Sequence, residues 1–166
     1  VFAAKNDVRI AVHMQLEGID NSDSIKDNLF REFEIYLSNS IKNAEIIARS
    51  SVDAIYQEQA KTFDALTDSE SSVALGKMLN ARHAVDVRIT SDGKKYRVTV
   101  QYADVEKGTI KTGSVKDTKS LFALSSCLQD VAKEFATFLR QVKRNTLDVS
   151  GALMLQDTNI VKADAK

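Results

Sequence analysis

The stretch from Leu75 to Ile110 constrains the fold of this chain more than any other segment. After the end of a helix it contains two runs in which apolar and polar residues alternate, the pattern of strands with one buried face. The dipeptide Asp92-Gly93 separates the two runs, and glycine tolerates the positive φ that hairpin turns require. The sequence therefore predicts a β-hairpin with a tight turn at Asp92-Gly93 and a second turn from Asp104 to Gly108.

Further strands and helices are predicted on both sides of this hairpin from the same two periodicities. Alternation predicts strands over Val8–Leu16 and Thr109–Val115, and a short apolar run predicts a third over Ala44–Ala48. Apolar residues spaced three and four apart predict four helices. These helices are expected to begin at Asp23 or Ser24, at Ser50 or Ser51, at the capping box Thr67–Glu70, and near Lys119.

The order of these elements indicates the fold class. Helices between the early strands imply parallel pairing, whereas the later hairpins impose antiparallel pairing. We therefore predict an α/β (α+β) fold with a mixed sheet of about five strands, packed by about four helices. The long last helix, ending near Lys143, carries an apolar stripe too wide for a coiled-coil seam, so we expect it to cover the sheet. Residues 1–143 are predicted to form one domain, and the polar tail over 144–166 either adds an edge strand or is flexible.

The charge balance limits the classes of partner. Lys and Arg total 23, as do Asp and Glu, so the formal net charge is zero. A neutral chain lacks the positive field that drives non-specific binding to nucleic acid or anionic membranes. No run approaches the roughly 18 apolar residues of a membrane-spanning helix. We therefore expect no nucleic-acid partner and no membrane span in this chain.

Residues that often carry chemistry are few and scattered along the sequence. The histidines are His13, on the first strand, and His83, in the turn before the hairpin, and neither has a partner at zinc-ligand spacing. Cys127 falls on an apolar helical stripe, where a core role is the usual one. The acidic loop from Glu17 to Asp23 lacks the ligand spacing and central glycine of a calcium loop. We expect no catalytic residue, no cofactor and no metal site.

Polar residues on the hairpin strands form a candidate partner surface. Several strands are polar on one side only, so helices are expected to cover one face of the sheet while much of the other faces water. A solvated face is the simpler interpretation, and a docking surface is the alternative. The residues that we predict for docking are Arg88, Arg97, Thr99 and Gln101.

Four segments resemble, in order and spacing, a recurring domain of bacterial envelope proteins. They are VRIAVHMQLEG (Val8 to Gly18), IIARSSVDAIYQEQ (Ile46 to Gln59), LGKMLNARHAVDVRI (Leu75 to Ile89) and DGKKYRVTVQYADVEKGTI (Asp92 to Ile110). This domain is shared by the curli secretion channel lipoprotein CsgG, the amino-terminal domain of TolB and the penicillin-binding-protein activator LpoB. The resemblance covers about Val8 to Val142, but no lipid-accepting cysteine lies near the amino end, and the turn Asn80–His83 is more polar than the family's glycine-rich turn.

The resemblance implies an exported bacterial protein, periplasmic or associated with the outer membrane, that is not an enzyme. It implies other envelope proteins as partners and a role in assembling a cell-surface or cell-wall structure, and it is compatible with a homo-oligomer. The start, Val1-Phe-Ala-Ala-Lys, resembles the small-residue end of a signal peptide, although an arbitrary boundary explains it equally well. An upstream lipid anchor is compatible with this start. An intracellular interaction or regulatory domain and a small hydrolase remain alternatives.

Overall fold

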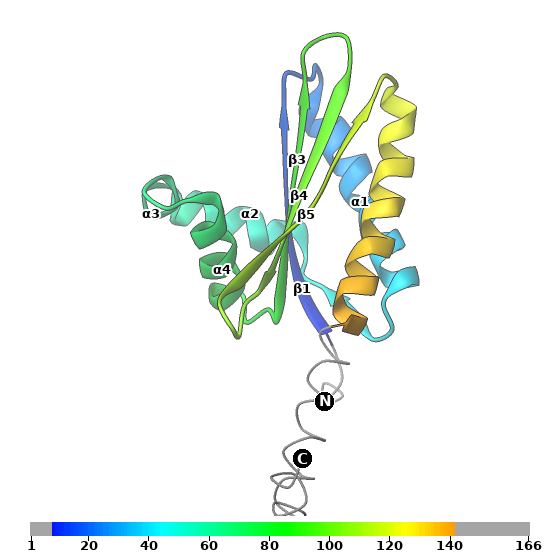
Figure 1. Ribbon diagram of the computed structural model, residues 1–166. Coiled ribbons are helices and arrows are strands. Elements are labelled where there is room, and N and C mark those ends of the chain that lie inside the picture. Colours follow the sequence, from blue (N-terminus) through cyan, green and yellow to red (C-terminus); the bar gives the residue numbers. More distant parts are fainter. Residues whose placement is uncertain (1–7, 142–166) are drawn as a thin grey trace, which may run out of the picture.

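A single mixed β-sheet organises the molecule (Figure 1). The computed structural model describes residues 8–141 of the chain, so the predicted tail lies outside the described residues. Within them the strands are β1 (Val8–Glu17), β2 (Ala44–Ile46), β3 (His83–Ser91), β4 (Tyr96–Asp104) and β5 (Thr109–Thr118), in the spatial order β2-β1-β3-β4-β5. Strand β1 pairs in parallel with β2 and β3, and the β3–β4 and β4–β5 pairs are antiparallel. The predicted mixed sheet is confirmed.

Helices cover both faces of this sheet, but unequally. They are α1 (Ser22–Ser40), α2 (Arg49–Glu58), α3 (Ala60–Asp64), α4 (Asp68–Met78) and a C-terminal helix over residues 121–141. Figure 1 shows α1 and the C-terminal helix side by side on one face, which we call the long-helix face, and α2 to α4 on the other, the short-helix face. A 2.6 Å hydrogen bond between the hydroxyls of Tyr36 and Ser125 joins the two long helices.

The long-helix face holds the larger core. Alternate residues of the central strands point into it, including Val87 and Val100, and they meet Phe33 of α1 and Phe135 of the C-terminal helix, all fully buried. Burial of each such side chain contributes roughly 1.5–3 kcal/mol. The predicted role of the long last helix, covering the sheet, is therefore confirmed. Cys127 packs half-buried against this core, and burial raises the pKa of its thiol.

The short-helix face holds a smaller core that occupies only one end of the sheet. Three paired alanines, Ala11, Ala84 and Ala103, form its floor, and their small side chains let α2 and α4 approach the strands closely. Val52 of α2 and Leu75 of α4 pack above them. Beyond this alanine row, the residues on the same face are polar, and the short helices do not extend over them. The rest of this face is therefore uncovered.

Several local predictions need correction. The turn after β3 spans residues 92–95, because the Asp92 carboxylate accepts the backbone N–H groups of Lys94 and Lys95 and closes a longer loop than a two-residue turn. Neither Asp23 nor Ser24 caps α1, which begins after Asn21 in the left-handed region with φ 55°. The predicted second helix leaves helical geometry at Gln59 and becomes α2 and α3.

Other local predictions are confirmed. Thr67 is the N-cap of α4, and its side-chain oxygen accepts the backbone N–H of Glu70 at 3.2 Å. The second turn follows β4, where the Asp104 carboxylate accepts the backbone N–H of Lys107. Within residues 8–141, no helix combines the length and the apolar character needed to cross a membrane.

Candidate docking face

The four residues predicted for docking share the uncovered part of the short-helix face. Arg88 on β3 lies opposite Thr99 on β4, and Arg97 and Gln101 flank Thr99 two residues away on either side. Arg97 is exposed and the other three are half-buried. The buried Oε1 of Gln101 has no hydrogen-bond partner among the described residues. We call this uncovered area, with Gln15 of β1 and Val115 of β5, the open face; whether it binds a partner is a prediction.

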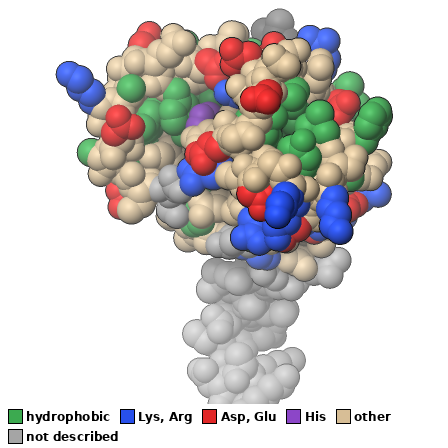
Figure 2. Space-filling view, turned by 90° about the horizontal axis from the view of Figure 1, so that it is seen from above, with side chains coloured by type: hydrophobic (Ala, Val, Ile, Leu, Met, Phe, Trp, Pro, Cys, Tyr) green, Lys and Arg blue, Asp and Glu red, His purple; other side chains and the backbone are tan. Residues whose placement is uncertain are grey.

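Charges on the open face are largely balanced. The Arg97 guanidinium donates to both carboxylate oxygens of Asp117, at 2.8 and 3.2 Å. This pair raises the pKa of Arg97 and lowers the pKa of the Asp117 carboxyl. Figure 2, which views the molecule from above Figure 1, shows a group of basic side chains at the lower right with acidic ones beside it, and further acidic side chains scattered over the rest of this side. Long-range electrostatic attraction is therefore a weak basis for partner selection here.

Val115 adds an exposed apolar side chain that the sequence pattern did not place on this face. Its side chain is 56% exposed, and it lies opposite Thr99. The pairing of β4 with β5 shifts between Val100 and Gln101, so that Gly113 has no residue opposite it. Such a bulge reverses the faces of all residues beyond it. Without the extra residue Val115 would lie opposite Val98, on the buried side of the sheet.

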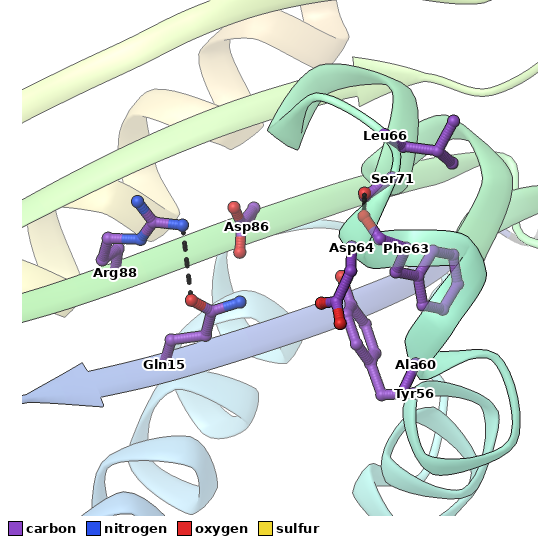
Figure 3. Close-up of a pocket in the computed structure, with 9 residues that line it drawn as sticks. All are labelled: Gln15, Tyr56, Ala60, Phe63, Asp64, Leu66, Ser71, Asp86 and Arg88. Atoms are coloured by element: carbon purple, nitrogen blue, oxygen red, sulfur yellow. Dashed lines mark hydrogen bonds between the residues drawn. The ribbon is translucent and has the colours of Figure 1, made fainter.

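A pocket of about 370 Å³ lies where the short helices end and the open face begins (Figure 3). We call it the seam pocket. Its helical wall is mostly apolar or aromatic, and its floor, built from β1 and β3, is polar. The wall consists of Tyr56, Ala60, Phe63, Asp64, Leu66 and Ser71, and the floor of Gln15, Asp86 and Arg88.

His13 lies beside the polar floor of the seam pocket and is buried. Its ring stacks on Tyr56, with ring centroids 3.7 Å apart and an interplanar angle of 8°. Its Nδ1 is 3.3 Å from both the Asp86 Oδ1 and the Gln15 Nε2. Because Nδ1 either donates or accepts, it bonds Asp86 when it carries a proton and Gln15 when it does not. Both contacts are long, so neither fixes the tautomer strongly.

The His13–Asp86 pair resembles part of a hydrolytic site, so the hydrolase alternative needs a nucleophile beside it. Ser71 is a hydroxyl that lines the same pocket. Its side chain donates to the backbone carbonyl of Phe63 at 3.4 Å, and within the described part of the chain no hydrogen bond joins it to His13. The geometry therefore supplies a base and an orienting carboxylate without a paired nucleophile. No three His, Cys, Asp or Glu side chains are grouped to hold a metal ion anywhere in the described ranges.

His83, predicted to lie in a turn, is instead the first residue of β3 and is buried at 4% exposure. Its ring meets Phe135 edge-on, with centroids 6.0 Å apart, on the long-helix face, away from the seam pocket. Burial lowers the pKa of His83, and the carboxylate of Asp104 opposes this shift in part. Its Nδ1 has no hydrogen-bond partner among the residues that the structure describes. His83 is therefore a structural residue that is buried in its neutral form.

We expect acid to destabilise the fold through His83. Its folded pKa lies below the usual value of 6.5, so between these two values the unfolded chain binds more protons. The stability that comes from keeping His83 neutral is fully present above pH 6.5, and it is lost as the pH falls through the folded pKa. Urea unfolding at about pH 7.5 and about pH 5.5 measures the loss. His83→Leu should remove this part of the pH dependence, and an unchanged dependence in that variant would contradict the assignment.

Comparisons with known proteins give structural likenesses only. No protein-family model matches the chain, and no curated protein matches it. The chain is similar to the LpoB C-terminal domain from Salmonella enterica, with 10% identity, a TM-score of 0.48, and coverage of 68% of this chain and 83% of that one. For the dodecamer of a single-residue variant of PelC from Paraburkholderia phytofirmans the corresponding values are 12%, 0.48, 77% and 87%.

The third likeness is to TolB from Acinetobacter baumannii, with 12% identity and a TM-score of 0.49. The match covers 80% of this chain but 28% of TolB, so the chain corresponds in length to a part of that protein. LpoB and TolB are two of the three proteins whose shared domain the sequence resembles. The third, CsgG, is not among these three structures.

Proposed function

We propose that this chain is a non-catalytic protein-interaction domain of the bacterial cell envelope, exported to the periplasm or the outer membrane. In this proposal it assists assembly of a surface or wall structure by binding other envelope proteins on its open face. The observation that supports it most directly is the uneven covering of the sheet, which leaves a polar area with a pocket at its border. The location and the assembly role rest on the sequence resemblance.

The open face is suited to protein docking because its backbone is held rigid from behind. The same strands are anchored on their other side by the core of α1 and the C-terminal helix. A pocket beside a rigid, mostly polar surface gives one partner side chain a place to be buried, while the surrounding polar groups pair at the rim. Val115 supplies an apolar contact within this surface.

The edge of β5 is a less suitable docking site than the open face. A partner strand that adds to an edge needs a regular ladder of backbone groups and a constant alternation of side chains. The bulge at Gly113 interrupts both in the middle of β5. Bulges of this kind protect exposed edges from pairing. We therefore assign docking to the face of the sheet and not to the β5 edge.

Reversing two charges on the open face tests the proposal. We expect the double variant Arg88→Glu with Arg97→Glu to keep the fold, because neither side chain is in a core. In cells, a photoreactive residue placed at position 99 should crosslink to the partner in the unaltered protein, and the double variant should abolish this crosslink. Thr99 lies next to both arginines, opposite Arg88 and two residues from Arg97 on β4, so the crosslinker reports on this surface directly. Circular dichroism and thermal unfolding check that the fold is kept.

The matched control reverses two exposed charges on the other side of the molecule, Arg31→Glu with Lys42→Glu, in and just after α1. This control should leave the crosslink unchanged. A crosslink that survives the Arg88 and Arg97 reversal, or one that both double variants abolish equally, would contradict docking on the open face. The envelope location is tested separately by fractionating cells that express the full-length gene, and recovery in the cytoplasm would favour the intracellular alternative.

A further inference from the structure

We propose that the seam pocket binds a basic side chain, arginine or lysine, of the docking partner. This inference rests on the proposed function, since it specifies the chemistry of the partner residue that the pocket receives. It is based on the charges that line the pocket, on the few hydrogen-bond partners of its two carboxylates, and on the apolar residues of its wall. Two carboxylates and one guanidinium belong to the lining, so its described charges sum to a net negative value.

The two carboxylates of the pocket have little to bind within the protein. Asp64 of α3 is exposed and forms no hydrogen bond or ion pair with any side chain that the structure describes. Asp86 of β3 is largely buried, with 13% of its side chain exposed, and its partner is His13 at 3.3 Å. Figure 3 shows Asp64 and Asp86 entering the pocket from the helical side and the sheet side respectively. A cation between them would be attracted by both carboxylates.

The guanidinium of the pocket offsets only one of these two negative charges. Arg88 donates from Nη2 to the Oε1 of Gln15 at 3.4 Å, along the sheet, and it has further contacts of its own. Its charge still repels a cation, so the favourable position is on the side of Asp64, away from Arg88 (Figure 3). A partly buried carboxylate also interacts more strongly with a cation than an exposed one, because the local dielectric constant is lower.

The apolar wall explains why the ligand is a long basic side chain and not a free metal ion. Tyr56, Phe63 and Leu66 line the helical side of the pocket. Lysine and arginine bury their methylene stems against such surfaces while the charged head reaches a polar site. An acidic side chain would find one guanidinium and two carboxylates, and a purely apolar one would desolvate both carboxylates without replacing their hydrogen bonds.

The experiment uses small probes of one side chain each. We titrate N-acetyl-arginine methylamide into ¹⁵N-labelled protein and follow the backbone amide resonances. We expect shifts at Gln15, Asp64 and Asp86 with a dissociation constant on the order of 1 mM. N-acetyl-citrulline methylamide has nearly the same shape without the charge, and it should bind at least about tenfold more weakly.

Substitutions then locate the site. The double variant Asp64→Asn with Asp86→Asn should abolish the resonance shifts. The matched control is Asp92→Asn with Asp117→Asn, two acid-to-amide changes near the hairpin turn, and it should keep the shifts. Equal binding of the citrulline probe, tighter binding of N-acetyl-glutamate methylamide, or shifts that persist after the Asp64 and Asp86 changes would overturn the inference. Partner crosslinking at position 99 is measured separately from probe binding. A failure of the docking proposal can therefore be distinguished from a failure of the cation site.

Discussion

Replacing Phe135 with alanine lowers the free energy of unfolding by about 3–5 kcal/mol. Phe135 is fully buried in the long-helix core, where its ring lies 4.9 Å from that of Tyr102 and 6.2 Å from that of Phe138, centroid to centroid. The deletion removes these contacts and leaves a cavity between β4 and the C-terminal helix. Neighbours that are themselves fully packed cannot collapse to fill it. Urea unfolding followed by far-ultraviolet circular dichroism measures the change.

The same helix provides the control for this substitution. Phe122 is 93% exposed near the start of the C-terminal helix, so Phe122→Ala removes a ring of the same size from solvent. Its effect should stay within about 0.5 kcal/mol. A Phe135→Ala loss below about 1 kcal/mol, or equal losses in the two variants, would show that the C-terminal helix does not pack on the sheet through Phe135.

The parts of the fold that the sequence predicts are those governed by local patterns. The alternation of Val85, Val87 and Ile89 identified a strand and its buried face, and β3 has both. The Thr67 hydroxyl three residues before Glu70 identified the start of α4 because a cap depends only on neighbouring residues. The stripe on the last helix was broad enough to distinguish a helix on a sheet from a coiled coil.

The candidate site depends on pairing between distant segments, and local patterns do not encode such pairing. His13 and Asp86 meet because β1 and β3 pair in parallel in one particular register. The seam pocket exists because the chain bends at Gln59 and α3 places Phe63 against the short-helix core. Val115 faces outward because of the bulge at Gly113, and a single unpaired residue leaves no periodic signal. The face carrying Arg88 and Thr99 was predictable, but the pocket at its border was not.

Gly18 lies at the end of the sheet, directly after β1 and close to the end of β3. Gly18→Ala should destabilise the protein by about 2–5 kcal/mol. Gly18 follows β1 with φ +72°, a left-handed conformation that costs an alanine about 1–2 kcal/mol. A Cβ at this position would also lie 2.4 Å from the backbone oxygen of Ser91, the last residue of β3. Because the obstacle is backbone, no side-chain rotation relieves it, and the ends of β1 and β3 must separate.

Gly108 is the matched control for Gly18, because it isolates the conformational part of the effect. It has a similar φ of +66°, but the methyl group of an alanine at that position would have no neighbour within 4 Å. Gly108→Ala should therefore cost only about 1–2 kcal/mol by urea unfolding. The difference between the two variants measures the close approach of Gly18 to Ser91. Equal losses would mean that Gly18 does not approach Ser91 closely, and the open face beside them would then lack the rigid support that docking requires.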